Sequence, residues 1–412
     1  MTTTRRPPTQ AMIVLLAAAF LNTIGVGIFL PVLPFIVQQY VREQGSLAIS
    51  VGWLASIYAI CQLVAAPVLG ALSDRYGRRP ILLLCLLGSA LGYALFGLGG
   101  ALWVLFAGRI IDGLTGGNFS ILSAYLADLT EPEDRGRYFG MVGATAGAGF
   151  IVGPALGGYA ARLGYSAPAY LAAAITALSL LWGLLFLPES LPATRRAERI
   201  SLSGFNLFGQ LRDALGMPQL RWLLLATFLF SLPFAILQST VAVLIIDRLG
   251  WGADTIGLLF LLVGAADILM QGVLAGRLLS AFGEVALTIA GLVCEVAAYL
   301  LIGTIALLAA PPLVFAGVIM YAVGTGLLEP ASRGLLSRAA GPRQQGLVQG
   351  ANQSVQSLAM VLGPVLGGVL YTSAGHGAPY WLSAGLIGLA ILAMLMVAPA
   401  LRAQPVAGLA EA

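Results

Sequence analysis

The sequence Gly153-Pro154-Ala155-Leu156-Gly157-Gly158 recurs later in the chain as Gly363-Pro364-Val365-Leu366-Gly367-Gly368. The two copies are 210 residues apart (363 − 153), and the same offset relates Gly136 to Gly346. Each of these two glycines opens the apolar stretch that carries its copy of the motif. Since the chain has 412 residues, the offset is about half of its length. The repeat therefore predicts a fold that is built from two related halves.

The composition places most of the chain in lipid. Hydrophobic residues make up 59% of the sequence, charged residues make up only 9%, and the mean hydropathy is +0.93. A soluble globular protein carries about 25% charged residues, so this chain lacks the charge to cover a water-facing surface. We therefore expect the lipid bilayer as its surroundings. The composition argues against a secreted disulfide protein, a nucleic-acid binder and an ordinary soluble enzyme.

Apolar stretches separated by short polar turns predict twelve membrane-spanning helices. A span takes roughly 20 residues, so twelve spans account for nearly all of the hydrophobic residues. The stretch after Arg5 and Arg6 is too long for a signal peptide and is interpreted as a retained first span. The predicted spans are 11–39, 49–72, 81–100, 102–126, 138–161, 168–187, 220–247, 255–276, 285–308, 312–337, 347–372 and 379–399.

The distribution of arginine predicts the orientation. The 21 basic residues are all arginine, and on the predicted topology 17 lie on one side of the membrane, while Arg42, Arg162 and Arg248 lie on the other and Arg109 lies within a span. The positive-inside rule then places both termini in the cytoplasm. The longest polar stretch divides six spans from six. We therefore predict a bundle at 1–187, a cytoplasmic loop at 188–218 and a second bundle at 219–412.

This organisation is typical of a secondary transporter, in which two bundles hold a substrate between them near the middle of the bilayer. The loop after the second span reads Gly70-Ala71-Leu72-Ser73-Asp74-Arg75-Tyr76-Gly77-Arg78-Arg79-Pro80. It resembles the loop 2–3 signature of the major facilitator superfamily almost residue for residue. The resemblance implies an all-α membrane fold of twelve helices in two pseudo-symmetric bundles, and a latch in which Asp74 pairs with arginine or with the helix start near Gly346. The gating residues it implies are Gly70, Asp74, Arg75, Gly77, Arg78, Arg135, Gly153 and Pro154.

Further stretches resemble the drug:proton antiporter branch of that family. Arg109 with Gly113 and Gly116 is similar to the span-4 motif of proton-coupled members, and Gly149 to Gly158 is similar to the span-5 antiporter motif. The glycines of the latter either pack helices or help Pro154 to bend one. Similarity to tetracycline and multidrug antiporters extends over Leu21 to Pro34, 127–130, 187–190 and 334–338.

The chain departs from the tetracycline pumps at several positions. Asn22 and Gly92-Tyr93 stand where those pumps carry acids in spans 1 and 3, and Asp267 replaces their span-8 histidine. Their span-9 acid is matched in kind by Glu295. The sequence therefore does not identify tetracycline as a substrate.

Five ionisable residues remain within the predicted spans, where an ionised side chain costs at least about 2.5–3.5 kcal/mol. Arg109 and Asp112 are three residues apart and form either a fixed ion pair or one that changes partners when Asp112 is protonated. Glu295 has no basic neighbour within a helical turn, so it is a candidate for proton coupling or substrate contact, or else a neutral acid bonded to a neighbouring helix. Asp267 has the same character. Glu329 precedes Pro330 and either satisfies the backbone that the proline frees or takes part in coupling.

Polar and aromatic residues in the spans are candidates for a central cavity, although each polar one could instead form an interhelical hydrogen bond. Few charges and many amides and aromatic rings favour a lipophilic or weakly basic substrate. The predicted substrate-binding residues are Asn22, Tyr58, Gln62, Asn118, Phe150, Phe230, Phe234, Gln238, Glu295, Tyr299, Asn352 and Gln356.

These observations together predict a proton-coupled exporter of small amphipathic compounds or drugs, one that could confer antibiotic resistance. We expect it in the bacterial inner membrane as a monomer. A facilitator or proton symporter for a small nutrient is the alternative. The sequence suggests no enzyme activity, no catalytic residue, no metal site, no nucleic-acid partner and no cofactor, and the proton gradient would supply the energy.

Overall fold

The computed structural model describes residues 9–41, 46–131, 134–197, 211–212, 214–339 and 345–402. These residues form helices, turns and irregular segments, and no strand occurs among them. Eleven helices in this part of the chain are long and apolar enough to cross a membrane. The predicted cytoplasmic ends, with Arg5 and Arg6, lie outside the described residues, as do Arg42, Arg343 and residues 198–210 and 213 of the predicted central loop.

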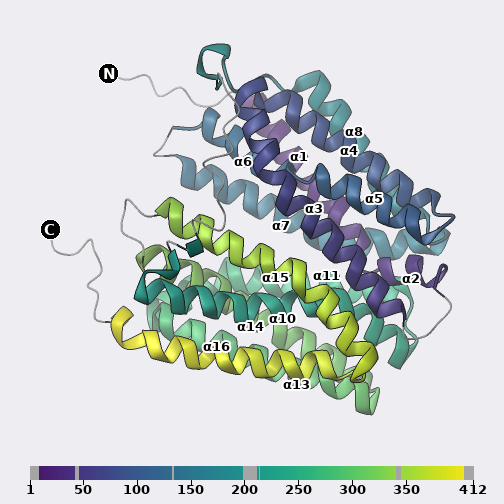
Figure 1. Cartoon of the computed structure of the whole chain (residues 1–412), viewed down its shortest axis with the longest axis vertical. Helices are drawn as coiled ribbons and strands as arrows, with labels where there is room; N and C mark the ends of the chain where they lie inside the picture. Colours follow the sequence, from purple (N-terminus) through teal and green to yellow (C-terminus); the bar gives the residue numbers. More distant parts are fainter. Residues whose placement is uncertain are drawn as a thin grey trace. The chain divides into compact units, whose positions relative to one another are not determined.

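The chain forms two compact units, each described here by itself. Unit 1 is Met1–Phe205 with Gly250–Gly264, and unit 2 is Asn206–Leu249 with Ala265–Ala412. The predicted boundaries at 187 and 219 stay a prediction. The helices of unit 1 are α1 (Thr9–Phe29), α2 (Leu33–Gln38), α3 (Ser46–Tyr76), α4 (Arg78–Leu98), α5 (Leu102–Leu114), α6 (Asn118–Leu129), α7 (Arg135–Ala160), α8 (Ala167–Phe186), the short 3₁₀ turns Ala161–Leu163 and Ala193–Arg195, and the first part of α11 (Ala253–Leu269) (Figure 1).

Unit 2 contains the remaining helices and the last residues of α11. A π-helical turn, η4, follows α11 directly and leads into a short helix before the next long one. The helices are α10 (Pro218–Leu249), η4 (Met270–Leu274), α12 (Ala275–Phe282), α13 (Glu284–Leu308), α14 (Pro311–Ala339), α15 (Gln345–Ser373) and α16 (Ala378–Arg402).

The structure divides two of the predicted spans. The expected span 11–39 consists of α1 and α2, because the chain turns at residues 30–32, and Pro34 is well suited to the first turn of a new helix. The expected span 102–126 consists of α5 and α6, which break at Thr115–Gly117. A side chain at Gly117 would approach Leu69 Cδ1 to 2.7 Å. This broken span is the reason that twelve predicted spans correspond to eleven long helices.

The repeated motif packs helices in both units. In unit 1, α7 lies against α1, and a Cβ atom at Gly153 would come within 2.8 Å of the Ile24 carbonyl oxygen. In unit 2, α15 lies against α10, and a Cβ atom at Gly363 would come within 2.5 Å of the Ala235 Cβ. Glycine at these positions allows the close approach of two helices. The structure thus shows close packing, and the bending role of Pro154 stays a prediction.

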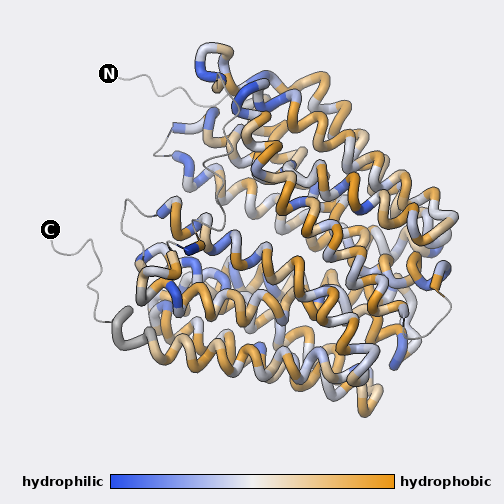
Figure 2. The backbone as a smooth tube through the Cα atoms, viewed as in Figure 1, coloured by the Kyte–Doolittle hydropathy of each residue, from blue (hydrophilic) through white to orange (hydrophobic). Residues whose placement is uncertain are grey.

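The distribution of polar residues along the helices matches a membrane protein. Hydrophilic residues gather near helix ends, while the middle parts of the helices are mostly hydrophobic (Figure 2). Large apolar side chains such as Trp103, Leu163 and Leu185 are exposed on the outside of their helices. In water such an extensive apolar surface would be unfavourable, whereas lipid chains accommodate it.

Candidate functional site

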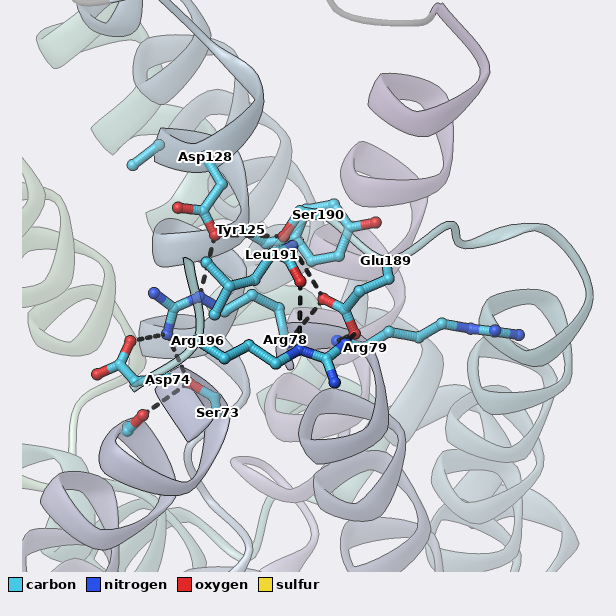
Figure 3. Close-up of polar contacts among 12 residues, drawn as sticks. Ser73, Asp74, Arg78, Arg79, Tyr125, Asp128, Glu189, Ser190, Leu191 and Arg196 are labelled. Carbon is cyan, nitrogen blue, oxygen red and sulfur yellow. Dashed lines mark hydrogen bonds and ion pairs between the residues drawn. The ribbon is translucent and has the colours of Figure 1, made fainter. Parts of the chain in front are cut away.

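The loop between α3 and α4 is held by ionic contacts around Arg78, the first residue of α4. Its guanidinium donates to Asp74 at 2.6 Å, to the Ser73 hydroxyl at 2.7 Å and to Asp128 at 3.1 Å. The Ser73 hydroxyl in turn donates to the Gly70 carbonyl oxygen at 2.8 Å. We call these five residues, together with Glu189, the loop cluster (Figure 3). The expected arginine partner of Asp74 is therefore Arg78 of the same loop.

Glu189, which follows α8, caps the start of α4. Its carboxylate accepts the backbone N–H of Arg78 at 2.8 Å and of Arg79 at 3.3 Å (Figure 3). Negative charge is favourable at this position, because the first amides of a helix have no partner within the helix. Gly77, directly before α4, has φ +107°, and a Cβ atom there would collide with the Glu189 carboxylate. Only glycine satisfies both conditions, which accounts for the motif at this position.

Two of the predicted gating arginines lie outside the loop cluster. The Arg75 guanidinium stacks over the ring of Tyr76 at 5.4 Å, and the Arg135 guanidinium donates to the Ala127 carbonyl oxygen at 3.2 Å. Sequence reasoning assigned no role to Asp128 or Glu189, although both fall in stretches that it had singled out. Both acids come directly after a predicted span, in stretches that resemble a known family, and this position could have indicated a role at the ends of the helices.

Arg109 on α5 is surrounded by aromatic rings in unit 1. Its guanidinium lies 5.1 Å from the ring centre of Phe29, 5.2 Å from that of Phe96 and 5.6 Å from that of Tyr58. Its Nη1 is 3.7 Å from an oxygen of Asp112, whose side chain is 4% exposed. The distance is long for a direct hydrogen bond. The pair is thus a buried ion pair with loose geometry, in which the rings also stabilise the cation.

Predicted polar residues form a chain of contacts beside this pair. The Asn118 amide donates to the Asn22 oxygen at 2.9 Å and to the Ser89 hydroxyl at 3.4 Å. The contacts therefore connect Asn22 on α1 to Ser89 on α4 through the amide of Asn118. Ser89 was not predicted from the sequence.

A second group of hydrogen bonds involves Gln62 and Tyr58, which both lie on helix α3. The Gln62 amide donates to the Tyr58 hydroxyl at 3.2 Å and to the Gly116 carbonyl oxygen at 3.0 Å, at the break between α5 and α6. Phe150, on α7, has an exposed fraction of 39%.

Close packing of α4 against α5 explains the glycine at position 92. A Cβ atom there would lie 2.8 Å from the Gly108 carbonyl oxygen and 3.0 Å from Asp112 Cβ. Since α4 and α5 approach so closely, an acidic side chain could not be placed there without moving one helix. The departure from the tetracycline pumps at this position thus goes together with a tight helix contact.

Glu295 lies deep in unit 2, with an exposed fraction of 4%. The Thr325 hydroxyl on α14 lies 3.5 Å from its carboxylate, and among the described residues no arginine lies within 4.0 Å. One turn further on α13, the fully buried Tyr299 makes an edge-to-face contact with Tyr321 at 6.1 Å. Tyr321 and Thr325 were not predicted, although they share one face of α14 with Glu329 at intervals of four residues.

The other two predicted acids of unit 2 have partners on their own helix segments. Both oxygens of Asp267 accept hydrogen bonds from the Gln271 amide, at 3.0 and 2.9 Å, where the π-helical turn η4 begins. Glu329 pairs with Arg333 at 2.8 Å, and its side chain is 41% exposed. The Glu329 carboxylate therefore points to an arginine and not to the backbone that Pro330 frees.

The remaining predicted residues lie on two helices of unit 2. Phe230, Phe234 and Gln238 follow one another at intervals of four residues on α10, and all three are half-buried. Asn352 and Gln356 share one face of α15, and Asn352 has an exposed fraction of 9%. Among the residues that the structure describes, no group of three or more His, Cys, Asp or Glu side chains could hold a metal ion.

Comparison with known proteins gives consistent results over the whole chain. A family model described as Major Facilitator Superfamily matches residues 15–294 and 223–411. The tetracycline resistance protein of class C from Escherichia coli is 35% identical over 95% of this chain and 96% of its own length. The class B protein from Escherichia coli is 30% identical over 89% of both chains.

Solved structures show the same fold. The crystal structure of the human organic anion transporter MFSD10 (TETRAN) matches with a TM-score of 0.71 and 28% identity, covering 94% of this chain and 100% of that one. The crystal structure of the nucleoside transporter NupG matches with a TM-score of 0.75 at 14% identity, covering 94% of this chain and 98% of that one. The second likeness concerns the fold alone.

Proposed function

Because the chain belongs to the major facilitator superfamily and is a multi-pass membrane transporter, not an enzyme, we propose that it exports small amphipathic compounds in exchange for protons. The proposal takes its direction from the tetracycline resistance proteins, which match nearly the whole chain. We place the protein in the bacterial inner membrane with both termini in the cytoplasm, as the arginine distribution favours. The proton gradient would drive transport without a further cofactor.

Glu295 is the observation that carries the proposal. Its carboxylate is buried in a helix, the Thr325 hydroxyl lies 3.5 Å from it, and among the described residues no arginine forms an ion pair with it. An ionised carboxylate in this position has a high free energy, so gain and loss of a proton there would be coupled to a change of surroundings. Substrate or protein rearrangement could provide that change.

We further propose that the Arg109–Asp112 pair takes part in switching. The 3.7 Å separation leaves the guanidinium free to choose between Asp112 and another acceptor when Asp112 is protonated. The surrounding rings of Phe29, Tyr58 and Phe96 keep the cation in place while it changes partner. Protons entering from outside would load Glu295 or Asp267, and Asp112, and would weaken substrate binding in the outward state.

The predicted amides and aromatic residues would contact the substrate. Few charged groups accompany them, so a lipophilic or weakly basic compound suits them better than a sugar phosphate, which needs several cations. The loop cluster around Arg78 would act as a latch and would not choose the substrate. A working monomer is expected.

The test uses the purified protein in liposomes with an imposed pH gradient. Addition of tetracycline, ethidium or another cationic dye that the protein transports should dissipate the gradient, and Glu295→Gln should abolish this response. Glu131→Gln, which changes an exposed carboxylate between α6 and α7, serves as the matched control and should keep it. Unchanged coupling in the Glu295→Gln variant would remove Glu295 from the mechanism.

A facilitator or proton symporter for a small nutrient is a second candidate. It is favoured by the neutral contact between Asn22 and Asn118, which stands where the tetracycline pumps have an acid. Substrate counterflow without any change of pH would support this candidate. If no compound in a broad panel of dyes and antibiotics is exported from a pump-deficient host, the nutrient transporter becomes the better proposal.

A further inference from the structure

The start of α13 in unit 2 repeats the start of α4 in unit 1. Gly77 directly precedes α4 with φ +107°, and Gly283 directly precedes α13 with φ +78°. The two glycines are 206 residues apart (283 − 77), and the same offset relates Gly70 to Gly276. Both helices therefore begin after a sharp turn of the same kind, which needs a glycine in the left-handed region.

An ion pair is repeated at the same place, with its charges exchanged. Arg78 is the first residue of α4 and pairs at 3.1 Å with Asp128, the residue before the last of α6. Glu284 is the first residue of α13 and pairs at 3.0 Å with Arg338, the residue before the last of α14. Arg338 follows Asp128 by 210 residues (338 − 128), the offset of the glycine motif. Each pair thus joins the start of one helix to the end of another within its unit.

The helix dipoles explain why the two polarities need different surroundings. An anion is favourable at the start of a helix and a cation at its end, so Glu284 and Arg338 both lie where the dipoles stabilise them. Arg78 and Asp128 have the opposite arrangement. In unit 1 the Glu189 carboxylate compensates, because it accepts two amides at the start of α4.

The position in unit 2 that corresponds to Glu189 by sequence offset carries no acid. The sequences that open α8 and α16, Ala167-Pro168 and Ala378-Pro379, are related by an offset of 211 residues (378 − 167). The same offset relates Glu189 to Ala400, which has no carboxylate. The anion at the start of α13 must then come from position 284 itself.

The surroundings of Glu284 fit this side chain. A Cβ atom at Gly334 would lie 2.5 Å from the Glu284 Oε1 atom, so glycine leaves the room that the carboxylate occupies. The pair is partly shielded, with side-chain exposures of 23% for Glu284 and 41% for Arg338. A cavity of about 160 Å³ lies beside it, lined by both charged residues and by Phe282, Val285 and Leu335. The ion pair therefore lies at the edge of the apolar packing between α13 and α14, beside a cavity.

We propose that Glu284 and Arg338 are positioning residues for transport, which form a second latch of reversed polarity and hold the start of α13 on the end of α14. The transport part of this inference rests on the proposed function, whereas the link between the helix ends does not. The two residues lie at the ends of their helices and touch neither Glu295 nor Asp267. They act on the rate of the conformational cycle and not on substrate affinity.

Hydrogen–deuterium exchange of the full-length protein in nanodiscs tests the link without any substrate. Glu284→Gln and Arg338→Gln should each accelerate exchange at the start of α13 and the end of α14 by about three- to fivefold, and the double variant should add little to either. Arg333→Gln, which changes another arginine of α14, is the matched control and should leave the start of α13 unchanged. Independent, additive effects of the two variants would overturn the link.

The polarity itself is tested by exchanging the two charges. Glu284→Arg combined with Arg338→Glu restores the attraction but places both charges against the helix dipoles, so exchange should remain about two- to threefold faster than in the unchanged protein. Full recovery of protection would overturn the argument from polarity.

Transport in liposomes supplies the readout that a purely structural contact would not move. With the compound used to show coupling of the unchanged protein, Glu284→Gln should lower the maximal rate by about three- to tenfold and leave the apparent KM unchanged. Loosened helix ends with an unchanged maximal rate would overturn the latch. If the unchanged protein moves none of the probes, the proposed function fails, and the exchange experiment still decides whether the pair links the helices.

Discussion

Alanine at Gly157 should destabilise the protein, whereas alanine at its repeat partner Gly367 should be tolerated. In unit 1, a Cβ atom at Gly157 would lie 2.9 and 3.0 Å from the Ile28 carbonyl carbon and Cα atom, and would overlap the Ile28 carbonyl oxygen. These are backbone atoms of α1 and cannot rotate away. At Gly367, the nearest atoms are the side-chain Cγ2 atoms of Thr240 and Ile236, at 3.1 and 3.2 Å, which can give by a few tenths of an ångström.

The expected magnitudes follow from two opposing terms. Alanine gains about 0.5–1 kcal/mol over glycine within a helix, and overpacking against atoms that cannot move costs about 1–3 kcal/mol. Gly157→Ala should therefore lower the free energy of unfolding by about 1–2 kcal/mol. Gly367→Ala should change it by less than about 0.5 kcal/mol, because its two terms nearly cancel.

Reversible unfolding of the purified protein in mixed detergent micelles measures both values. Gly147→Ala is the matched control, since it lies on the same helix α7 and a Cβ atom there meets nothing within 4 Å. This variant should be neutral or slightly stabilising, which would show that alanine itself is acceptable in α7. Equal destabilisation by Gly157→Ala and Gly367→Ala, or none in either, would refute the packing argument.

Three further substitutions test individual contacts. Glu189→Gln should weaken the cap on α4 and accelerate hydrogen exchange in its first turn by about fivefold, and an unchanged rate would contradict the role of the carboxylate. Asn118→Ala should lower the free energy of unfolding by about 1–2 kcal/mol in the same micelle assay, because it leaves the oxygen of Asn22 without its donor at 2.9 Å; a neutral result would show that the amide contact contributes nothing. Tyr371→Phe should lower the free energy of unfolding by about 1–2 kcal/mol in that assay, because it removes the hydroxyl that donates to Asp247 at 2.7 Å. A change below about 0.3 kcal/mol would count against that hydrogen bond.

The sequence by itself determined the class of fold and the positions of most of the long helices. Composition required lipid as the surroundings, and the predicted spans 49–72, 81–100 and 285–308 each lie within an observed helix or differ from one by two residues at most. Apolar length is a local property, so a linear scan detects it. The repeat at Gly153 and Gly363 also predicted two halves, because a repeated motif can be read directly from the sequence.

The tertiary structure decided which residues meet. Asp128 and Glu189 are 50 and 111 residues from Arg78, and no local pattern indicates that they share one cluster. Only the packing of α4 beside α6 and the segment after α8 brings the three side chains together. In the same way, Thr325 reaches Glu295 because α14 packs against α13.

The structure also decided where the two halves differ. The repeated motif makes Gly157 and Gly367 equivalent in sequence, yet one faces backbone and the other faces side chains, because the distance between the packed helices is set by all residues along both. The exchanged charges of Arg78 and Glu284 are visible in the sequence, but their pairing with the ends of α6 and α14 is not. Sequence periodicity thus specifies the elements, and the packing of those elements specifies the contacts on which the proposed gating and coupling depend.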